Sequence, residues 1–246
     1  MWAIISDIHA NLEALEAVAK DIEKHNVEKV ICLGDIVGFG PNPCECVDWV
    51  MRCDVTLMGD HDESVFGNLE LLNLSATQSV LWTRSKLRNA DDPLARARLD
   101  FLGSRPLTHT DGDKLIVHGS PRNPLNEYIF PEDIHNSKKM EKIFHELDRY
   151  CFHGHTHVPG VIAEDLRFLS PMELGNTYRL DGRKTLIDVG SVGQPRDGDP
   201  RACYVLLDDD IVIFRRIDYD MTATVIKIRD NPDLDDFLGT RLISGR

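Results

Sequence analysis

The sequence predicts an α/β fold in which two β-sheets pack together. Short apolar runs recur along the chain, and each ends in Gly, Asp or His, which is typical of buried strands. Between the first two runs, residues 11–22 place apolar side chains on one helical face, so they predict the crossover helix of a βαβ unit. After His157 the pattern changes to alternating and β-branched segments, which indicate a second sheet packed on the first.

The expected strands share an apolar composition and a length of a few residues. The buried runs lie at residues 2–5, 30–33, 55–58, 115–117, 150–152 and 186–189. The segments expected to form the second sheet lie at 161–163, 203–207 and 211–217.

Besides the crossover helix, helices are expected in two further places. Asn11 can act as N-cap of the crossover helix, and a contact with substrate is an equally good interpretation of this residue. Residues 63–105 predict a helical insertion, with helices near 76–87 and 93–102, the second one capped by Asp92 and opened by Pro93. Residues 221–246 predict a tail of two short helices separated at Pro232. No repeat or linker divides the chain, so we expect one domain over residues 1–246.

The composition excludes several classes of protein. A formal net charge of −13 disfavours binding to duplex nucleic acid or to anionic membranes. No apolar stretch reaches the roughly twenty residues that span a bilayer, and the N-terminus resembles no signal peptide, so we expect a cytoplasmic protein. Six cysteines in 246 residues are too sparse for a disulfide framework and predict free thiols.

Polar side chains that bind metals follow five of the apolar runs. They occur in Asp7-Ile8-His9, Gly34-Asp35, Gly59-Asp60-His61-Asp62, His118-Gly119 and Gly154-His155-Thr156-His157. In extended backbone, residues two apart point to the same side, and the carboxyl edge of an α/β sheet is where sites assemble. Each motif alone is also compatible with an ordinary turn, but all five together, each after an apolar run, predict one pocket.

These motifs resemble those of the calcineurin-like metallophosphoesterase superfamily. Further stretches resemble a bacterial branch of it: GDIVGFGPNP at 34–43, VHGSP at 117–121 and GSVGQPR at 190–196. The resemblance implies a four-layer αββα sandwich, with two mixed sheets face to face and helices outside. It also implies two metal sites, the first held by Asp7, His9 and His157, the second by Asp60, His118 and His155, with Asp35 bridging both.

The implied ligands suit two divalent ions of manganese, iron or zinc, because carboxylates and neutral imidazoles are present and no thiolate is involved. Two such ions can share a water and lower its pKa, so a bridging hydroxide is the expected nucleophile in the hydrolysis of a phosphate mono- or diester. His61 resembles the catalytic histidine that protonates the leaving oxygen. A structural hydrogen bond below the metal ligands is the alternative for His61.

The chain departs from the superfamily at one ligand. Asp60 stands where asparagine is usual, and it adds one negative charge to those of Asp7 and Asp35. We therefore expect tighter metal retention and weaker attraction for an anionic substrate. The extra charge also keeps open a second function, in which the protein is a catalytically weak metal-holding interaction or scaffold module.

Substrate contacts are less well defined by the sequence. Arg196 can grip two phosphate oxygens, or it can form a surface salt bridge with Asp197 or Asp199. The expected partner is a small phosphorylated substrate or a phosphoprotein. A nuclease with the same ligands is a third possibility, but the net charge of −13 and the lack of a basic strip argue against it.

Overall fold

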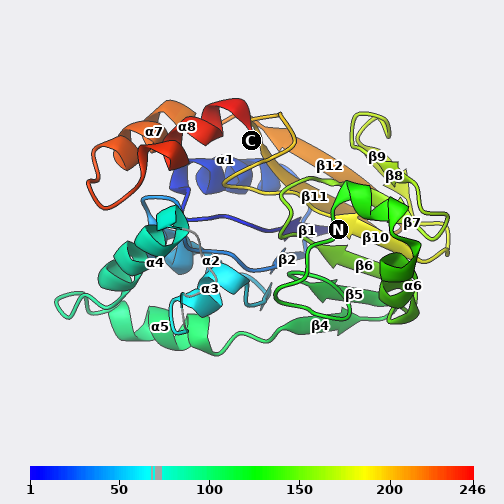
Figure 1. The fold of residues 1–246 in the computed structure, drawn as a ribbon, viewed down its shortest axis with the longest axis horizontal. Helices are drawn as coiled ribbons and strands as arrows, with labels where there is room; N and C mark the ends of the chain where they lie inside the picture. The colour runs from blue at the N-terminus through cyan, green and yellow to red at the C-terminus, as the bar shows by residue number, and fades with distance from the viewer. Residues whose placement is uncertain (68, 70–73) are drawn as a thin grey trace.

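The computed structural model describes residues 1–67, 69 and 74–246, and its strands form two six-stranded sheets (Figure 1). In spatial order, the first sheet contains β3 (Val55–Thr56), β2 (Lys29–Cys32), β1 (Trp2–Ile5), β11 (Ala202–Asp208), β12 (Ile211–Ile217) and β9 (Thr177–Arg179). The second contains β4 (Thr108–Asp111), β5 (Lys114–Val117), β6 (Tyr150–His153), β10 (Thr185–Asp188), β7 (Gly160–Ala163) and β8 (Phe168–Leu169).

Both sheets mix parallel and antiparallel pairs, as the sequence predicts. In the first sheet β1 is parallel to β2 and antiparallel to β11, with Ile4 opposite both Ile31 and Val205. In the second, β6 is parallel to β5 and β10, and β10 is antiparallel to β7. The parallel strands β1, β2, β3, β5 and β6 are those that the five polar motifs follow.

The core between the sheets is built from alternate residues of the strands. Ile4 and Val205 of the first sheet pack with Phe152 and Ile187 of the second in one buried cluster. The neighbouring residue Ile5 points to the other face and packs against α1. Strands that are buried on both faces explain the continuous apolar runs of the sequence.

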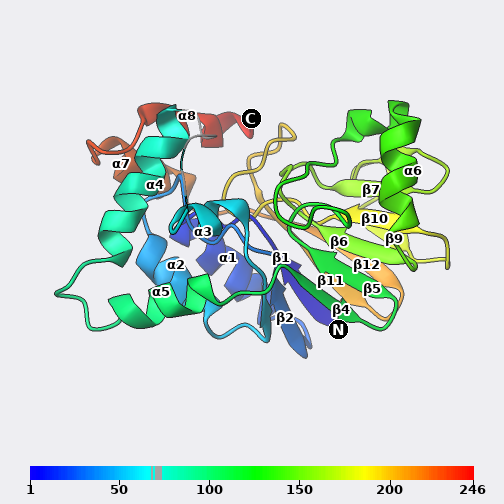
Figure 2. The ribbon, with the colours of Figure 1, turned by 60° about the horizontal axis from the view of Figure 1, so that its bottom comes forward.

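Helices cover the outer faces and complete four layers (Figures 1 and 2). The helices around the first sheet and its ends are α1 (Leu12–Ile22), α2 (Pro43–Val50), α3 (Asp60–Ser64), α4 (Leu74–Leu87), α5 (Ala95–Gly103), α7 (Met221–Arg229) and α8 (Asp236–Ser244). On the second sheet, α6 (Ser137–His145) follows a 3-10 turn, η1 (Pro131–His135), and buries Met140 and Ile143 against Cys151 and Leu186.

One prediction about the sheets is wrong in detail. The segments at 203–207 and 211–217 were expected in the second sheet, but β11 and β12 extend the first sheet beside β1. β11 is buried on both faces: Val205 joins the core between the sheets, and Tyr204 joins the core under α1. Burial on both faces is a property of a central strand, and the position in the sequence does not reveal which sheet such a strand joins.

The start of α5 also differs from the prediction. The helix begins at Ala95 instead of Pro93, and the Asp92 carboxylate accepts a hydrogen bond from Leu94 N in the preceding turn. Residues 68 and 70–73 of the predicted insertion lie outside the described residues. The strands β4 and β9 were not predicted, because they are short and partly exposed and have no apolar run.

Two further properties bear on the expected class of protein. All six cysteines are free, as predicted. In the described part of the chain, no helix is both long enough and apolar enough to cross a membrane.

Candidate metal centre

The polar residues that follow the five strands converge at one rim of the two sheets. Asp7 and His9 follow β1, Asp35 follows β2, and Asp60 opens α3 just after β3. From the second sheet, His118 follows β5, and His155 and His157 follow β6. Six of these side chains are almost fully buried, and Asp60 is partly exposed. The structure therefore brings together all seven predicted metal ligands.

Five of these seven residues have a left-handed backbone. The φ angles are 54° at Asp7, 47° at His9, 52° at Asp35, 69° at His155 and 62° at His157. Each such conformation costs a non-glycine residue on the order of 1 kcal/mol and persists only where the surrounding structure enforces it. Main-chain hydrogen bonds do this here, for example from Asp7 N to Gly34 O at 3.1 Å and from His9 N to Asp35 O at 2.9 Å. The turns after the strands thus aim the side chains inward.

Close backbone approach also shapes the centre. A Cβ atom on Gly59 would lie 2.1 Å from Asp35 Oδ1, and one on Gly193 would lie 1.7 Å from Ile8 O. No side chain fits in either place. This explains why glycine precedes Asp60 and why the GSVGQPR stretch can pass beside the loop after β1.

Asp7, His9 and His157 form the first ligand group. Their metal-binding atoms lie within 4.8 Å of one another. The Nε2 atom of His157 lies 3.2 Å from Asp7 Oδ1 and 3.2 Å from the Nε2 atom of His9.

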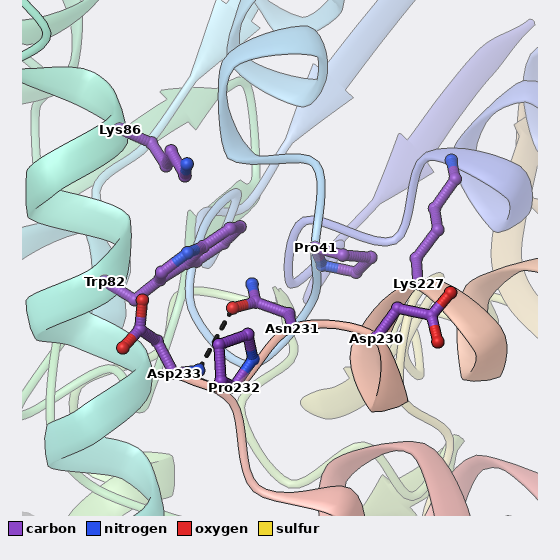
Figure 3. A pocket seen from close by; sticks show the side chains of 8 residues that line it. All are labelled: Pro41, Trp82, Lys86, Lys227, Asp230, Asn231, Pro232 and Asp233. Atoms are coloured by element: carbon purple, nitrogen blue, oxygen red, sulfur yellow. Dashed lines mark hydrogen bonds between the residues drawn. The ribbon is translucent and has the colours of Figure 1, made fainter.

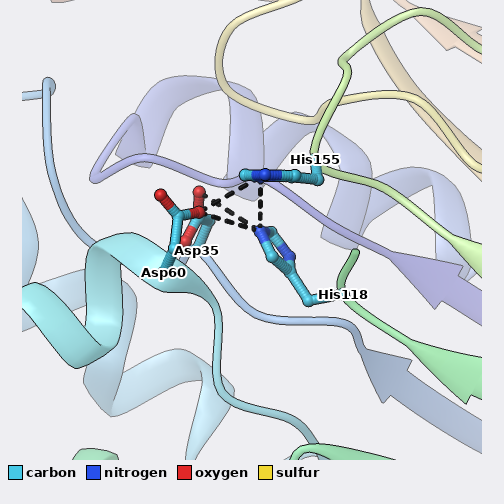
Figure 4. A group of neighbouring side chains, drawn as sticks. All are labelled: Asp35, Asp60, His118 and His155. Carbon is cyan, nitrogen blue, oxygen red and sulfur yellow. Dashed lines mark hydrogen bonds and ion pairs between the residues drawn. The ribbon is translucent and has the colours of Figure 1, made fainter. Parts of the chain in front are cut away.

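Asp35, Asp60, His118 and His155 form the second group (Figure 4). Asp60 Oδ1 lies 3.2 Å from His118 Nε2 and 3.1 Å from His155 Nδ1, and these two nitrogens are 3.1 Å apart. Asp35 connects the two groups: its Oδ2 atom lies 3.5 Å from His9 Nε2 and 3.6 Å from His118 Nε2. Its other oxygen accepts a hydrogen bond from His61 N at 2.8 Å.

In the first group, the atoms that face one another are not satisfied by hydrogen bonds and are suited to a cation. The outward nitrogen of each ring donates to a main-chain oxygen, His9 Nδ1 to Val37 O at 3.2 Å and His157 Nδ1 to Gln194 O at 2.5 Å. This leaves both Nε2 atoms as lone pairs that face each other. Asp7 Oδ1 is buried without a hydrogen-bond partner. Two lone pairs and an unpaired carboxylate oxygen are stabilised only by a positive charge between them, so the residues fit a divalent transition metal.

The pKa values of the ligands follow from burial and from their neighbours. Burial, reinforced by Arg196, lowers the pKa of His157 to about 4, so this ring is neutral at pH 7 and free to coordinate. At His118 burial also acts to lower the pKa, but Asp35 and the hydrogen bond to Asp60 outweigh it and raise the pKa to about 10. At pH 7 a proton on His118 therefore offsets part of the negative charge of Asp35 and Asp60.

Two polar residues that are not metal ligands hold the ligand-bearing loops in place. The Asp62 carboxylate accepts hydrogen bonds from Ile36 N at 2.9 Å, Val37 N at 3.2 Å and Gly59 N at 3.1 Å, and so ties the loops after β2 and β3 together. Ser191 Oγ donates to Asp7 O at 2.8 Å. The sequence motifs contain both residues, but only the folded chain shows that they position the ligands.

A family model described as the calcineurin-like phosphoesterase superfamily domain matches residues 1–210. The chain belongs to the calcineurin-like phosphoesterase superfamily. The match includes every residue of the two ligand groups and ends before α7 and α8.

Three known proteins match the whole chain, two in sequence and one in fold. The chain is 38% identical to a metallophosphoesterase of Sphaerobacter thermophilus, whose crystal structure superposes with a TM-score of 0.82 over 100% of this chain and 98% of that one. It is also 38% identical to an uncharacterized protein of Methanocaldococcus jannaschii, over 100% of this chain and 98% of that protein. A hypothetical protein of Pyrococcus horikoshii, 20% identical, shares the fold with a TM-score of 0.78, over 100% of this chain and 99% of that one.

His61 lies beside the two ligand groups of this superfamily member. Its ring meets that of His9 edge-on, with centroids 5.0 Å apart, and that of Phe39 at 4.3 Å. Burial lowers the pKa of His61 to about 4, although Asp60 acts to raise it. His61 Nδ1 is buried without a hydrogen-bond partner. One ring nitrogen lies close enough to His9 and Asp35 to join them as a third group of potential ligands.

The two predicted substrate contacts differ in what the structure offers them. The Asn11 side chain caps α1 through Ala14 N at 3.2 Å, donates to Gly193 O at 2.8 Å and accepts from Thr224 Oγ1 at 3.0 Å. Its amide is thus occupied by protein partners, which favours the N-cap interpretation. Arg196 instead lines a pocket above the centre, and Asp197 and Asp199 pair with other arginines, Arg216 and Arg201.

In the described part of the chain, two pockets large enough for a small ligand bear on the position of the substrate site. The one above the centre has a volume of about 650 Å³ and is lined by Asp60, His61, Tyr128 and Arg196. Tyr128, which no motif indicates, stacks on His155 with ring centroids 3.7 Å apart. The other pocket, about 490 Å³, lies beside Trp82 of α4 and the loop between α7 and α8 (Figure 3). None of the residues drawn there belongs to a ligand group, so the pocket above the centre is the candidate substrate site.

Proposed function

We propose that the protein is a metal-dependent hydrolase of phosphate mono- or diesters, acting on a small phosphorylated molecule or a phosphoprotein. The observation that carries this proposal is the position of the Asp35 carboxylate between two buried groups of ligands. Membership of the superfamily and the 38% identical metallophosphoesterase support it.

The seven side chains would hold two divalent ions of manganese, iron or zinc, with Asp35 shared between Asp7, His9, His157 on one side and Asp60, His118, His155 on the other. Such ions lower the pKa of water enough to supply hydroxide near neutral pH. Neither group contains a cysteine, so a thiolate is not expected among the metal ligands.

The remaining roles belong to the chain's own residues. His61, at the floor of the pocket, would donate a proton to the leaving oxygen, and a bound phosphate dianion would raise the pKa of His61 toward the range where it can do so. Arg196 would grip the oxygens of the phosphate that is cleaved, since its guanidinium lines the same pocket. Tyr128 would shield His155 from bulk water by stacking on its ring.

A metal-titrated assay tests this proposal. The metal-stripped protein is loaded with Mn²⁺, Fe²⁺ or Zn²⁺ and assayed on a monoester, a diester and a dinucleoside polyphosphate. We expect His61→Ala to lower kcat by about 10² to 10⁴ while metal binding persists, and Asp35→Ala to abolish both. His145→Ala, an exposed histidine of α6, is the matched control.

Two outcomes would contradict the phosphoesterase proposal. Wild-type protein that binds metal but hydrolyses no ester would favour the metal-holding scaffold. Activity that survives Asp35→Ala would show that the two groups do not act together.

We also propose that the protein acts in the cytoplasm and binds neither nucleic acid nor membranes. The net charge of −13 and the free cysteines support this. Salt-sensitive binding to duplex DNA in a gel-shift titration would contradict it.

A further inference from the structure

The pocket above the metal centre has a wall that the family match does not include. Helix α8 contributes Phe237, Leu238 and Arg241 to it, and α8 lies beyond residue 210, where the match ends. The floor, formed by Asp60 and His61, belongs to the shared domain. Residues on α8 are therefore placed to choose the substrate without taking part in the chemistry.

The volume of the pocket exceeds what one phosphate needs. At about 650 Å³ it falls within the range of pockets that enclose a small organic ligand. A substrate bound with its phosphate on the floor would extend its leaving group toward α8.

Two arginines line this pocket, and in the described residues neither forms an ion pair with a carboxylate side chain. Arg196 donates from Nη2 to Gln194 Oε1 at 2.8 Å, and its Nε is buried without a partner. Arg241 donates from Nε to the main-chain oxygen of Arg246 at 2.8 Å, and its guanidinium carbon lies 5.5 Å from the centre of the Phe237 ring. Among the other partly buried arginines, Arg98 pairs with Asp48 and Arg216 with Asp197. Arg84 and Arg105 instead donate to main-chain oxygens.

The two guanidinium groups also lie near each other. Burial, together with the charge of Arg196, lowers the pKa of Arg241 to about 10. Burial lowers the pKa of Arg196, and the nearby carboxylates of the metal centre act to raise it. These carboxylates are Asp7, Asp35 and Asp60. Arg196 is thus the inner and Arg241 the outer of the two charges. Two like charges that line one cavity favour the binding of an anion between or beside them.

We propose that the substrate carries a second phosphate group on its leaving part, and that Arg241 is the specificity-determining residue that binds it. Arg196 holds the phosphate over the metal centre, and Arg241 holds the other one at the α8 wall. This proposal rests on the proposed function, because it assigns the substrate class of the same site.

The test compares glucose 6-phosphate with glucose 1,6-bisphosphate on the metal-loaded protein. We expect wild type to have a kcat/KM about tenfold higher for the bisphosphate, as one added charge-assisted contact produces. Arg241→Gln should reduce this preference to near one, and Arg241→Lys should restore part of it. Arg229→Gln, which removes the same charge from an exposed site on α7 outside this pocket, should keep the wild-type preference.

A binding measurement separates this inference from the proposed function. Calorimetric titration of the metal-free proteins with glucose 1,6-bisphosphate should show at least about fivefold tighter binding by wild type than by Arg241→Gln. If no ester is hydrolysed but this difference holds, the proposed function fails and the anion site stands. Equal binding by both proteins, or a preference for the bisphosphate that persists in Arg241→Gln, would overturn the inference.

Discussion

The imidazole rings of His9 and His157 present their Nε2 atoms to each other at 3.2 Å, while hydrogen bonds to main-chain oxygens occupy their Nδ1 atoms. The second ligand group shows a similar approach, with His118 Nε2 and His155 Nδ1 3.1 Å apart. Burial acts to lower the pKa of His118, but Asp35 and Asp60 raise it to about 10. Both arrangements are suited to a cation with little rearrangement.

Metal binding should stabilise the fold. A ligand present at about 100 times its Kd contributes about 2.7 kcal/mol, which for a chain of this size corresponds to a rise in Tm of roughly 5–10 °C. Adding Mn²⁺ or Zn²⁺ to the stripped protein should produce such a rise in calorimetry. The rise should be smaller in His157→Ala and unchanged in His145→Ala. An equal rise in His157→Ala would argue against the first ligand group.

Asp60→Asn should loosen the metals. The substitution removes a carboxylate that lies 3.2 Å from His118 Nε2, and with it one negative charge from the centre. We expect faster metal loss to a chelator, together with a lower KM for an anionic substrate. Both are measured on the same protein, by stopped-flow chelation and by steady-state kinetics. Slower metal loss in the variant would refute the role assigned to this charge.

The stability of the protein should depend on Asp21 at acidic pH. Burial acts to raise the pKa of Asp21, but hydrogen bonds from Tyr204 Oη at 2.9 Å and Arg215 Nε at 3.0 Å hold it below the usual value of 3.8. A lowered folded-state pKa contributes stability that is present above pH 3.8 and lost as pH falls through the folded-state pKa.

Urea unfolding of Asp21→Asn checks this dependence. At pH 7 the variant should be less stable than wild type by about 1–3 kcal/mol, since a charged acceptor is lost from a buried network. The difference should narrow as the pH falls below 3.8. A difference that stays constant down to pH 2 would show that the carboxylate does not titrate in this way.

Gly193→Ala should destabilise the fold and the centre together. The added methyl group would lie 1.7 Å from Ile8 O, so the loop after β1 must move away from the GSVGQPR stretch. Overpacking of this kind costs about 1–3 kcal/mol. At Gly67 the new Cβ would meet its nearest neighbour at 3.5 Å, so Gly67→Ala should change the free energy of unfolding by less than about 0.5 kcal/mol. Similar losses of unfolding free energy in both variants would contradict the steric role assigned to Gly193.

The sequence predicted that these seven Asp and His side chains would come together, because each of them follows a strand end. An apolar run followed by Asp or His marks the same edge of a sheet each time, and Asp7, Asp35 and His118 are recognisable on that basis. The sequence did not predict the order of the strands. β11 is equally apolar toward both faces, so its pattern does not distinguish a place beside β1 from a place in the other sheet.

Residues that act through packing or distant contacts left no local signal. Tyr128 reaches His155 from a long irregular segment, and Arg241 reaches the pocket from the end of the chain. Asn11 shows the converse: its position after His9 suits both substrate binding and capping, and the contacts with Thr224 and Gly193 decide which partners it has. Such assignments require the folded coordinates.

The left-handed turns have a consequence for the rate at which the protein would take up metal. They lie at Asp7, His9, Asp35, His155 and His157. Main-chain hydrogen bonds from the neighbouring strands and loops hold their conformation, for example from Asp7 N to Gly34 O and from His9 N to Asp35 O. After a chelator removes the metal, the ligand side chains should therefore keep their orientation. Metal uptake should then be fast and reversible, because no loop has to refold before an ion binds.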